Sequence, residues 1–122
     1  MTLGKYAEGQ KQYLEGLSRA PDNTHLLTDY ATWFLSQYYG LMQGGLGSDA
    51  VRNLDSAIVY LKKSFDIDGM DQNTSYKLSV SYLAKGDCPQ AWEYFDKCLT
   101  LGGRPITKEF SAALKKKCKK RN

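Results

Sequence analysis

A repeat with a period of 34 residues is the feature of this sequence that most restricts its fold. The segment 57–69 (AIVYLKKSFDIDG) aligns with the segment 91–103 (AWEYFDKCLTLGG), and both have Ala, Tyr, Lys and Gly at corresponding positions. In each segment small or apolar residues recur at i, i+4, i+7 and i+8, the spacing of one stripe on an amphipathic helix. A repeat of this length predicts helical units that stack and bury a shared core.

A second kind of helix is predicted ahead of each of these segments. It has a large, a small and a large residue at i, i+1 and i+4, and these residues are Tyr30, Ala31 and Phe34 and, later, Leu78, Ser79 and Tyr82. Each unit is therefore predicted to be an antiparallel helical hairpin. A more divergent copy of the second helix lies near the N-terminus and consists of Gly9, Tyr13, Gly16, Leu17 and Pro21.

The sequence predicts an all-α domain of about six helices over residues 1–122. Their approximate ranges are 2–19, 24–39, 48–67, 72–85, 88–101 and 106–119. The turn before the fifth helix is marked by Gly86, which ends one helix, and by Asp87 and Gln90, which form a capping box for the next.

The earlier unit carries an insertion. Its two helix patterns are separated by 23 residues, from Phe34 to Ala57, against 9 in the later unit, an excess of 14. The excess falls in a Gly-rich stretch, so a loop is predicted over 40–48, with Ser48 capping the following helix. Such a loop either carries function or is an idle surface connection, and the sequence leaves both readings open.

These patterns resemble the tetratricopeptide repeat family. Its motif is matched in order by Leu78, Ser79, Tyr82, Ala91, Phe95 and Cys98, with Gly103 in place of the terminal Pro. The resemblance implies a short right-handed solenoid with a half-repeat at 2–21, a repeat at 24–70 and a repeat at 72–105. A capping helix at 106–119 would follow, with Phe110, Ala113 and Leu114 facing inward.

In this family the first helices of successive units line a concave groove that holds a protein or peptide. The resemblance therefore implies that this chain is an adaptor that binds such a partner and does not catalyse a reaction. The groove positions carried over to this sequence are His25, Thr28, Asp29, Thr32, Ser36, Asn73, Tyr76, Lys77, Val80, Thr107 and Phe110. Tyr76 and Phe110 are expected to contribute most, because aromatic side chains give a large contact area for little lost entropy.

The basic tail supports a rival function. The net charge is +4, and six positive charges lie within seven residues, at Lys115, Lys116, Lys117, Lys119, Lys120 and Arg121. Such a tail suits RNA or an anionic membrane, and it equally suits a solvated helix end stabilised by the helix dipole. The short array also leaves homodimerisation open.

Little in the sequence indicates catalysis or a cofactor. His25 is the only histidine, and Cys88, Cys98 and Cys118 form no CxxC pair, so a metal site is not expected. The three cysteines are predicted to be reduced thiols, at least one of them in the core. With no apolar run of membrane-spanning length and no signal-type segment, the sequence predicts a cytoplasmic protein.

Overall fold

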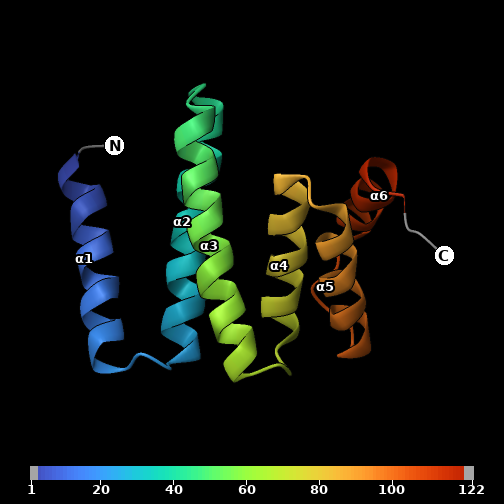
Figure 1. Ribbon diagram of the computed structural model, residues 1–122, viewed down its shortest axis with the longest axis horizontal. Helices are drawn as coiled ribbons and strands as arrows, with labels where there is room; N and C mark the ends of the chain where they lie inside the picture. The colour runs from blue at the N-terminus through green and yellow to red at the C-terminus, as the bar shows by residue number, and fades with distance from the viewer. Residues whose placement is uncertain (1–2, 120–122) are drawn as a thin grey trace.

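The computed structural model describes residues 3–119, and over this range it is entirely helical, with six helices and no strand. The predicted all-α fold class is therefore confirmed. The helices, joined by short turns, are α1 (Leu3–Arg19), α2 (Thr24–Gln43), α3 (Gly47–Ile67), α4 (Gln72–Lys85), α5 (Cys88–Thr100) and α6 (Lys108–Lys117). Helices α1 to α5 stand side by side in chain order, and α6 lies at the C-terminal end (Figure 1).

Polar side chains cap the helices where the sequence changes from turn to helix. The carboxylate of Asp87 accepts a hydrogen bond from the backbone N–H of Gln90 at 3.2 Å, which confirms the predicted cap of α5. The preceding Gly86 ends α4 with a φ of 87°, a left-handed conformation that glycine adopts without a Cβ clash. Asn23, Asp71 and Thr107 cap α2, α4 and α6 in the same way.

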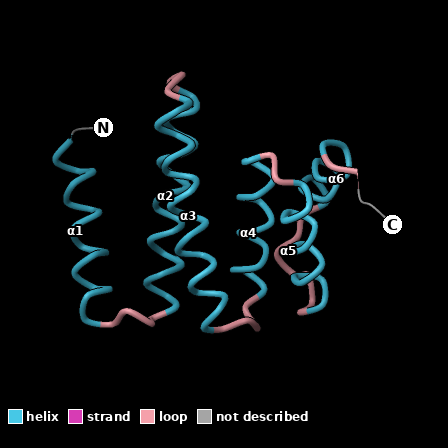
Figure 2. The backbone as a smooth tube through the Cα atoms, in the orientation of Figure 1, coloured by secondary structure: helices cyan, strands magenta, loops and turns pink. Residues whose placement is uncertain are grey.

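The predicted loop over 40–48 was wrong in extent. Helix α2 continues to Gln43 and α3 begins at Gly47, so only residues 44–46 lie outside a helix, and α3 has no side-chain cap from Ser48. The inserted residues lengthen both helices, and the α2–α3 hairpin extends well beyond the end of α4 (Figure 2). Within the stretch predicted as a loop, Leu41 packs against the core cluster, and this burial offsets the low helix propensity of Gly40, which costs about 1 kcal/mol.

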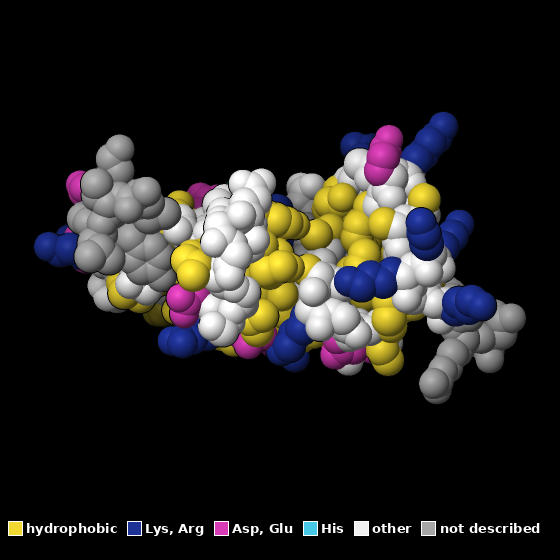
Figure 3. All heavy atoms as spheres, turned by 90° about the horizontal axis from the view of Figure 1, so that it is seen from above, with side chains coloured by type: hydrophobic (Ala, Val, Ile, Leu, Met, Phe, Trp, Pro, Cys, Tyr) yellow, Lys and Arg dark blue, Asp and Glu magenta, His cyan; other side chains and the backbone are white. Residues whose placement is uncertain are grey.

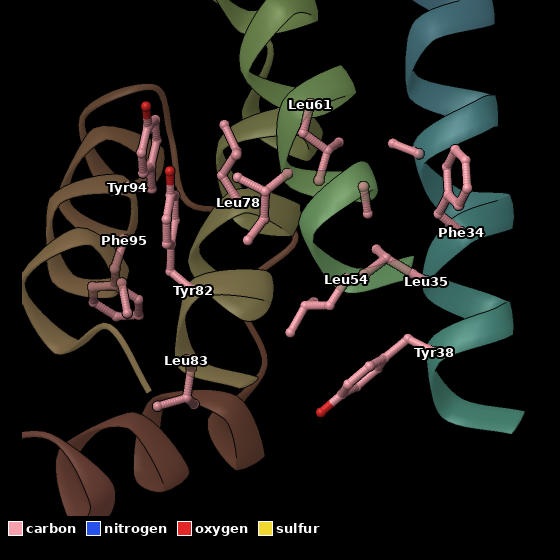
Figure 4. Packing of buried hydrophobic residues seen from close by; sticks show 14 of the residues in the cluster. Phe34, Leu35, Tyr38, Leu54, Leu61, Leu78, Tyr82, Leu83, Tyr94 and Phe95 are labelled. Carbon is pink, nitrogen blue, oxygen red and sulfur yellow. The ribbon is translucent and has the colours of Figure 1, made fainter. Parts of the chain in front are cut away.

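The core consists of large side chains packed against small ones on neighbouring helices. Leu54 and Leu61 of α3 belong to the same cluster as Phe34 and Leu35 of α2, while Leu78 and Tyr82 of α4 pack near Tyr94 and Phe95 of α5 (Figure 4). The small residues Ala31, Ala57 and Ala91 are completely buried. The predicted role of the small repeat positions in helix packing agrees with this burial.

Helix α1 is attached to α2 through an aromatic contact and two glycines. Tyr13 stacks on Tyr30 with ring centroids 5.0 Å apart. A Cβ on Gly9 would lie 3.1 Å from the indole nitrogen of Trp33, and one on Gly16 would lie 3.2 Å from Leu26. The small positions of this divergent copy therefore allow α2 to approach closely.

Helix α6 departs from the phase that the repeat predicts. Leu114 is fully buried and Phe110 is half-buried, as expected, but Ala113 is exposed and the neighbouring Ala112 is exposed as well. The buried stripe is instead Phe110, Leu114 and Cys118, at i, i+4 and i+8. The larger apolar side chains occupy the buried side of α6 because their burial removes more apolar surface from water than burial of alanine does.

The prediction of three reduced thiols was wrong for two of them. Cys88, the first residue of α5, and Cys118, the C-cap of α6, form a disulfide with their Cα atoms 5.4 Å apart. Cys98 is free and buried, which confirms a core thiol. The two bonded cysteines are 30 residues apart and become neighbours only because α6 folds back over the start of α5.

Candidate functional site

Three aromatic residues from three different helices form the most distinctive partly exposed surface of the molecule. We call Tyr39 of α2, Tyr76 of α4 and Phe110 of α6 the aromatic strip. The rings of Tyr76 and Phe110 meet edge to face, with centroids 5.3 Å apart. Tyr39 is 50% exposed; its ring contacts Tyr38, and Tyr76 acts on its phenol only through a weaker electrostatic effect that raises the pKa.

The packing of α4 explains why Tyr76 reaches this surface. Helix α4 is covered on one side by α3 and on another by α5, so residues around most of its circumference are buried. The stripe left partly open has the spacing i, i+3, i+4 and i+7 and consists of Asn73, Tyr76, Lys77 and Val80. These are the four α4 positions that the family resemblance implied for the groove.

A hydrogen bond joins this stripe to α2. The amine of Lys77 donates to the hydroxyl of Thr32 at 2.9 Å, and that hydroxyl in turn donates to the carbonyl of Thr28 at 2.9 Å. Helices α2 and α4 are not consecutive in the chain, so this contact shows that the open sides of alternate helices meet. An ammonium group has three donors, so Lys77 retains donors for a second acceptor such as a peptide carbonyl or carboxylate.

Two of the predicted groove residues have roles inside the fold. The hydroxyl of Thr28 lies 3.1 Å from that of Ser64 on α3, and Thr28 is half-buried. The hydroxyl of Thr107 accepts the backbone N–H of Phe110 at 3.0 Å and so caps α6. Both residues position the helices that carry the strip.

Four more of the predicted residues are exposed. They are His25, Asp29, Ser36 and Asn73. Asn73 borders a hollow at the start of α4 that it shares with Met70 and Arg104. The structure thus brings Thr32, Tyr76, Lys77 and Phe110 together, keeps Asn73 and Val80 beside them on the open stripe of α4, and leaves His25, Asp29 and Ser36 at the periphery.

Tyr39 was not among the predicted groove residues, although the sequence placed it at the end of the helix predicted over 24–39. In the longer α2 it lies one residue after the buried Tyr38, on the exposed side of the helix. Burial raises the pKa of the Tyr39 phenol, and the neighbouring phenols of Tyr38 and Tyr76 raise it further. Tyr39 therefore stays protonated near neutral pH and can donate a hydrogen bond.

The basic tail is partly tied to the body of the protein. Lys115, Lys116, Lys117 and Lys119 are exposed, and the amine of Lys117 donates to the carbonyl of Leu83 at 3.2 Å. Lys120 and Arg121 lie outside the described residues. Several Lys and Arg side chains are visible at the C-terminal end when the molecule is viewed from above, beside apolar side chains that gather between the helices (Figure 3).

Other kinds of site were sought among the described residues. No group of three or more His, Cys, Asp or Glu side chains there is arranged to hold a metal ion. None of the described helices has both the length and the apolar character to cross a membrane. The sequence matches no protein-family model, and no curated protein is significantly similar to it.

Proposed function

We propose that this protein is a binding module that holds a partner protein or peptide on the aromatic strip and the adjoining stripe of α4, without catalysis. The observation that carries the proposal is the edge-to-face contact of Tyr76 and Phe110, from two helices, on the open side of α4, with the exposed Tyr39 of α2 within electrostatic reach of Tyr76. Partly exposed aromatic side chains are the residues that most often dominate binding energy at protein interfaces.

We also propose that the helices stack in the manner of tetratricopeptide repeats. The complete burial of Ala31, Ala57 and Ala91 supports this arrangement, because the motif requires small residues where helices approach closely. The hydrogen bond between Lys77 and Thr32 supports it too, since alternate helices then share one face. Helix α6 stands outside this register and closes the array.

The disulfide also bears on the cellular compartment in which the protein functions. The cytoplasmic location predicted from the sequence depended in part on reduced cysteines, and the Cys88–Cys118 disulfide removes that support. Structural disulfides persist in oxidising compartments and are rare in the cytosol. We therefore propose that the protein works where this bond stays oxidised.

A displayed library of random peptides, selected on the oxidised protein, tests the binding surface. Binding of a selected peptide is then measured on Tyr39→Ala and Tyr76→Ala variants, with Val59→Ala as the matched control, because Val59 is 62% exposed on α3. Loss of a dominant aromatic contact weakens binding roughly tenfold or more. We expect that loss for both tyrosine variants and unchanged affinity for Val59→Ala.

The rival function through the tail needs a variant that keeps the fold. Deletion of 115–122 is unsuitable because it removes Cys118 and breaks the disulfide. A triple charge reversal of Lys115, Lys116 and Lys119 to Glu preserves that bond. Two results would assign the function to the tail. In the first, the charge-reversal variant loses peptide binding while the tyrosine variants keep it. In the second, the wild type binds RNA or anionic vesicles, and the charge reversal abolishes that binding while the tyrosine substitutions do not.

A further inference from the structure

The disulfide holds in place the helix that carries one residue of the aromatic strip. It joins the first residue of α5 to the residue that ends α6, and α6 supplies Phe110. Phe110 contacts Tyr76 within the strip and also lies 6.3 Å from the buried Phe95, measured between ring centroids. One wall of the proposed binding surface is therefore held in place by a redox-sensitive bond.

Without the disulfide, α6 has few other attachments. They are the burial of Leu114, the contacts of Phe110, the hydrogen bond of the Trp92 indole to the carbonyl of Cys118 at 2.8 Å, and the bond from Lys117 to Leu83. The helix has 10 residues, which is too short to be stable alone in water. Segments with few buried apolar contacts are the ones that open locally.

The sequence around α6 also favours release once the bond is broken. Gly102 and Gly103, both with positive φ, lie in the connection from α5, where the backbone N–H of Arg104 donates to the side chain of Gln72 at 2.9 Å. Once that hydrogen bond opens, the two glycines allow more backbone conformations than other residues would. Ala112 and Ala113 are exposed, so the outer side of α6 contributes no apolar packing. Opening the disulfide restores the freedom of a long chain segment, which favours the undocked state.

The disulfide is accessible to a reductant. A hollow whose walls include Trp92, Lys117 and Lys119 opens onto both bonded cysteines, and Cys88 is half-buried rather than enclosed. The hollow carries the carboxylates of Glu93 and Asp96 as well as these two ammonium groups, so the exposure of Cys88, and not a net positive charge, is what lets a reductant reach the bond.

We propose that oxidation of Cys88 and Cys118 assembles the binding surface and that reduction by a dithiol dismantles it. In the reductive direction one thiolate of the dithiol attacks the sulfur of Cys88, the bond between the two sulfurs breaks, and Cys118 leaves as a thiolate that takes up a proton. The second thiol of the reductant then displaces Cys88, which also ends as a thiol, and the reductant becomes a cyclic disulfide. Helix α6 then detaches from α4 and α5, and Phe110 no longer contacts Tyr76. This inference rests on the proposed function.

The test compares the oxidised protein with the same protein in dithiothreitol, and with a Cys88→Ser/Cys118→Ser variant. Amide hydrogen exchange reports release of α6 independently of any ligand. We expect the protection factors of the amides in 108–117 to fall at least tenfold in the reduced protein and in the variant. The protection factors of 72–85 and 88–100 should stay unchanged. A Cys98→Ser variant should respond to dithiothreitol as the wild type does.

Peptide affinity is the second measurement, made with a peptide selected on the oxidised protein. We expect reduction to weaken its binding about tenfold, reoxidation to restore it, and dithiothreitol to have no effect on the double-serine variant. Unchanged protection of 108–117 after reduction overturns the inference, and so does loss of protection throughout α4 and α5, since that is global unfolding. If α6 is released but affinity stays the same, the control of binding is refuted while the groove stands. If no selected peptide depends on Tyr76, the proposed function fails and this control of it fails as well.

Discussion

The sharpest test of the packing is to place the same larger residue at two alanines that the sequence treats alike. The resemblance predicted that Ala91 of α5 and Ala113 of α6 both face inward, whereas Ala91 is completely buried and Ala113 is exposed. Replacing each by leucine makes an identical chemical change within a helix. The intrinsic helix propensity of the two residues differs little, so it cancels between the variants.

The cost at position 91 follows from its surroundings. Overpacking a filled core costs about 1–3 kcal/mol. The hydroxyl of Ser79 on α4 also donates to the carbonyl of Ala91 at 2.7 Å, so the two helices approach closely at this point. Separating them weakens a buried hydrogen bond, which contributes about 1 kcal/mol more. We therefore expect Ala91→Leu to lower the free energy of unfolding by about 2–4 kcal/mol, and Ala113→Leu to change it by about 0.5 kcal/mol or less.

Urea denaturation followed by circular dichroism measures both variants against the wild type. With an m-value of about 1–3 kcal/mol/M, the midpoint for Ala91→Leu falls by on the order of 1–2 M. The midpoint for Ala113→Leu should not move. Equal destabilisation by both variants would refute the orientation of α6, and a neutral Ala91→Leu would refute the close approach of α4 and α5.

Three further predictions follow from polar and titratable groups. Asp71→Ala should lower the free energy of unfolding by about 0.5–2 kcal/mol in the same assay, because it removes the acceptors for the N–H of Asn73 and the hydroxyl of Thr74. Asp49→Ala is the control and should change stability little, because the ion pair of Asp49 with Arg52 is exposed. The hydrogen bond to Asp55 raises the pKa of Lys85, so the contribution of this ion pair to stability is complete below the ordinary lysine pKa and is lost as the pH rises through the higher folded-state value. Both side chains are about half exposed, so a double-mutant cycle at neutral pH should give a coupling energy of about 0.2–1 kcal/mol. This coupling should decrease as salt is added. Burial raises the pKa of the Cys98 thiol, so its alkylation by iodoacetamide at mildly alkaline pH should be slow in the native protein and fast in urea; rapid native labelling would contradict its burial.

Much of the local structure could be read from the sequence because its causes are local. The amphipathic spacing in 57–69 and 91–103 specifies helices whatever they pack against, and Gly86 with Asp87 specifies a turn through backbone and capping chemistry. The open stripe of α4 was implied by the resemblance to tetratricopeptide repeats and not by helical spacing alone.

Other features depend on contacts between distant parts of the chain. The glycines of 40–48 favour a loop by propensity, but Leu41 packs against the core when α2 continues to Gln43. Cysteine spacing does not specify pairing, so the bond from Cys88 to Cys118 could not be predicted.

The sequence by itself determined that this protein is a set of helical hairpins with small residues at their contacts, because period and residue size act over a few neighbouring turns. Only the tertiary structure decided which side of α6 is buried and that Phe110 of α6 contacts Tyr76 of α4. Those outcomes depend on how much apolar surface each alternative packing removes from water, and that quantity exists only once the helices have been placed against one another.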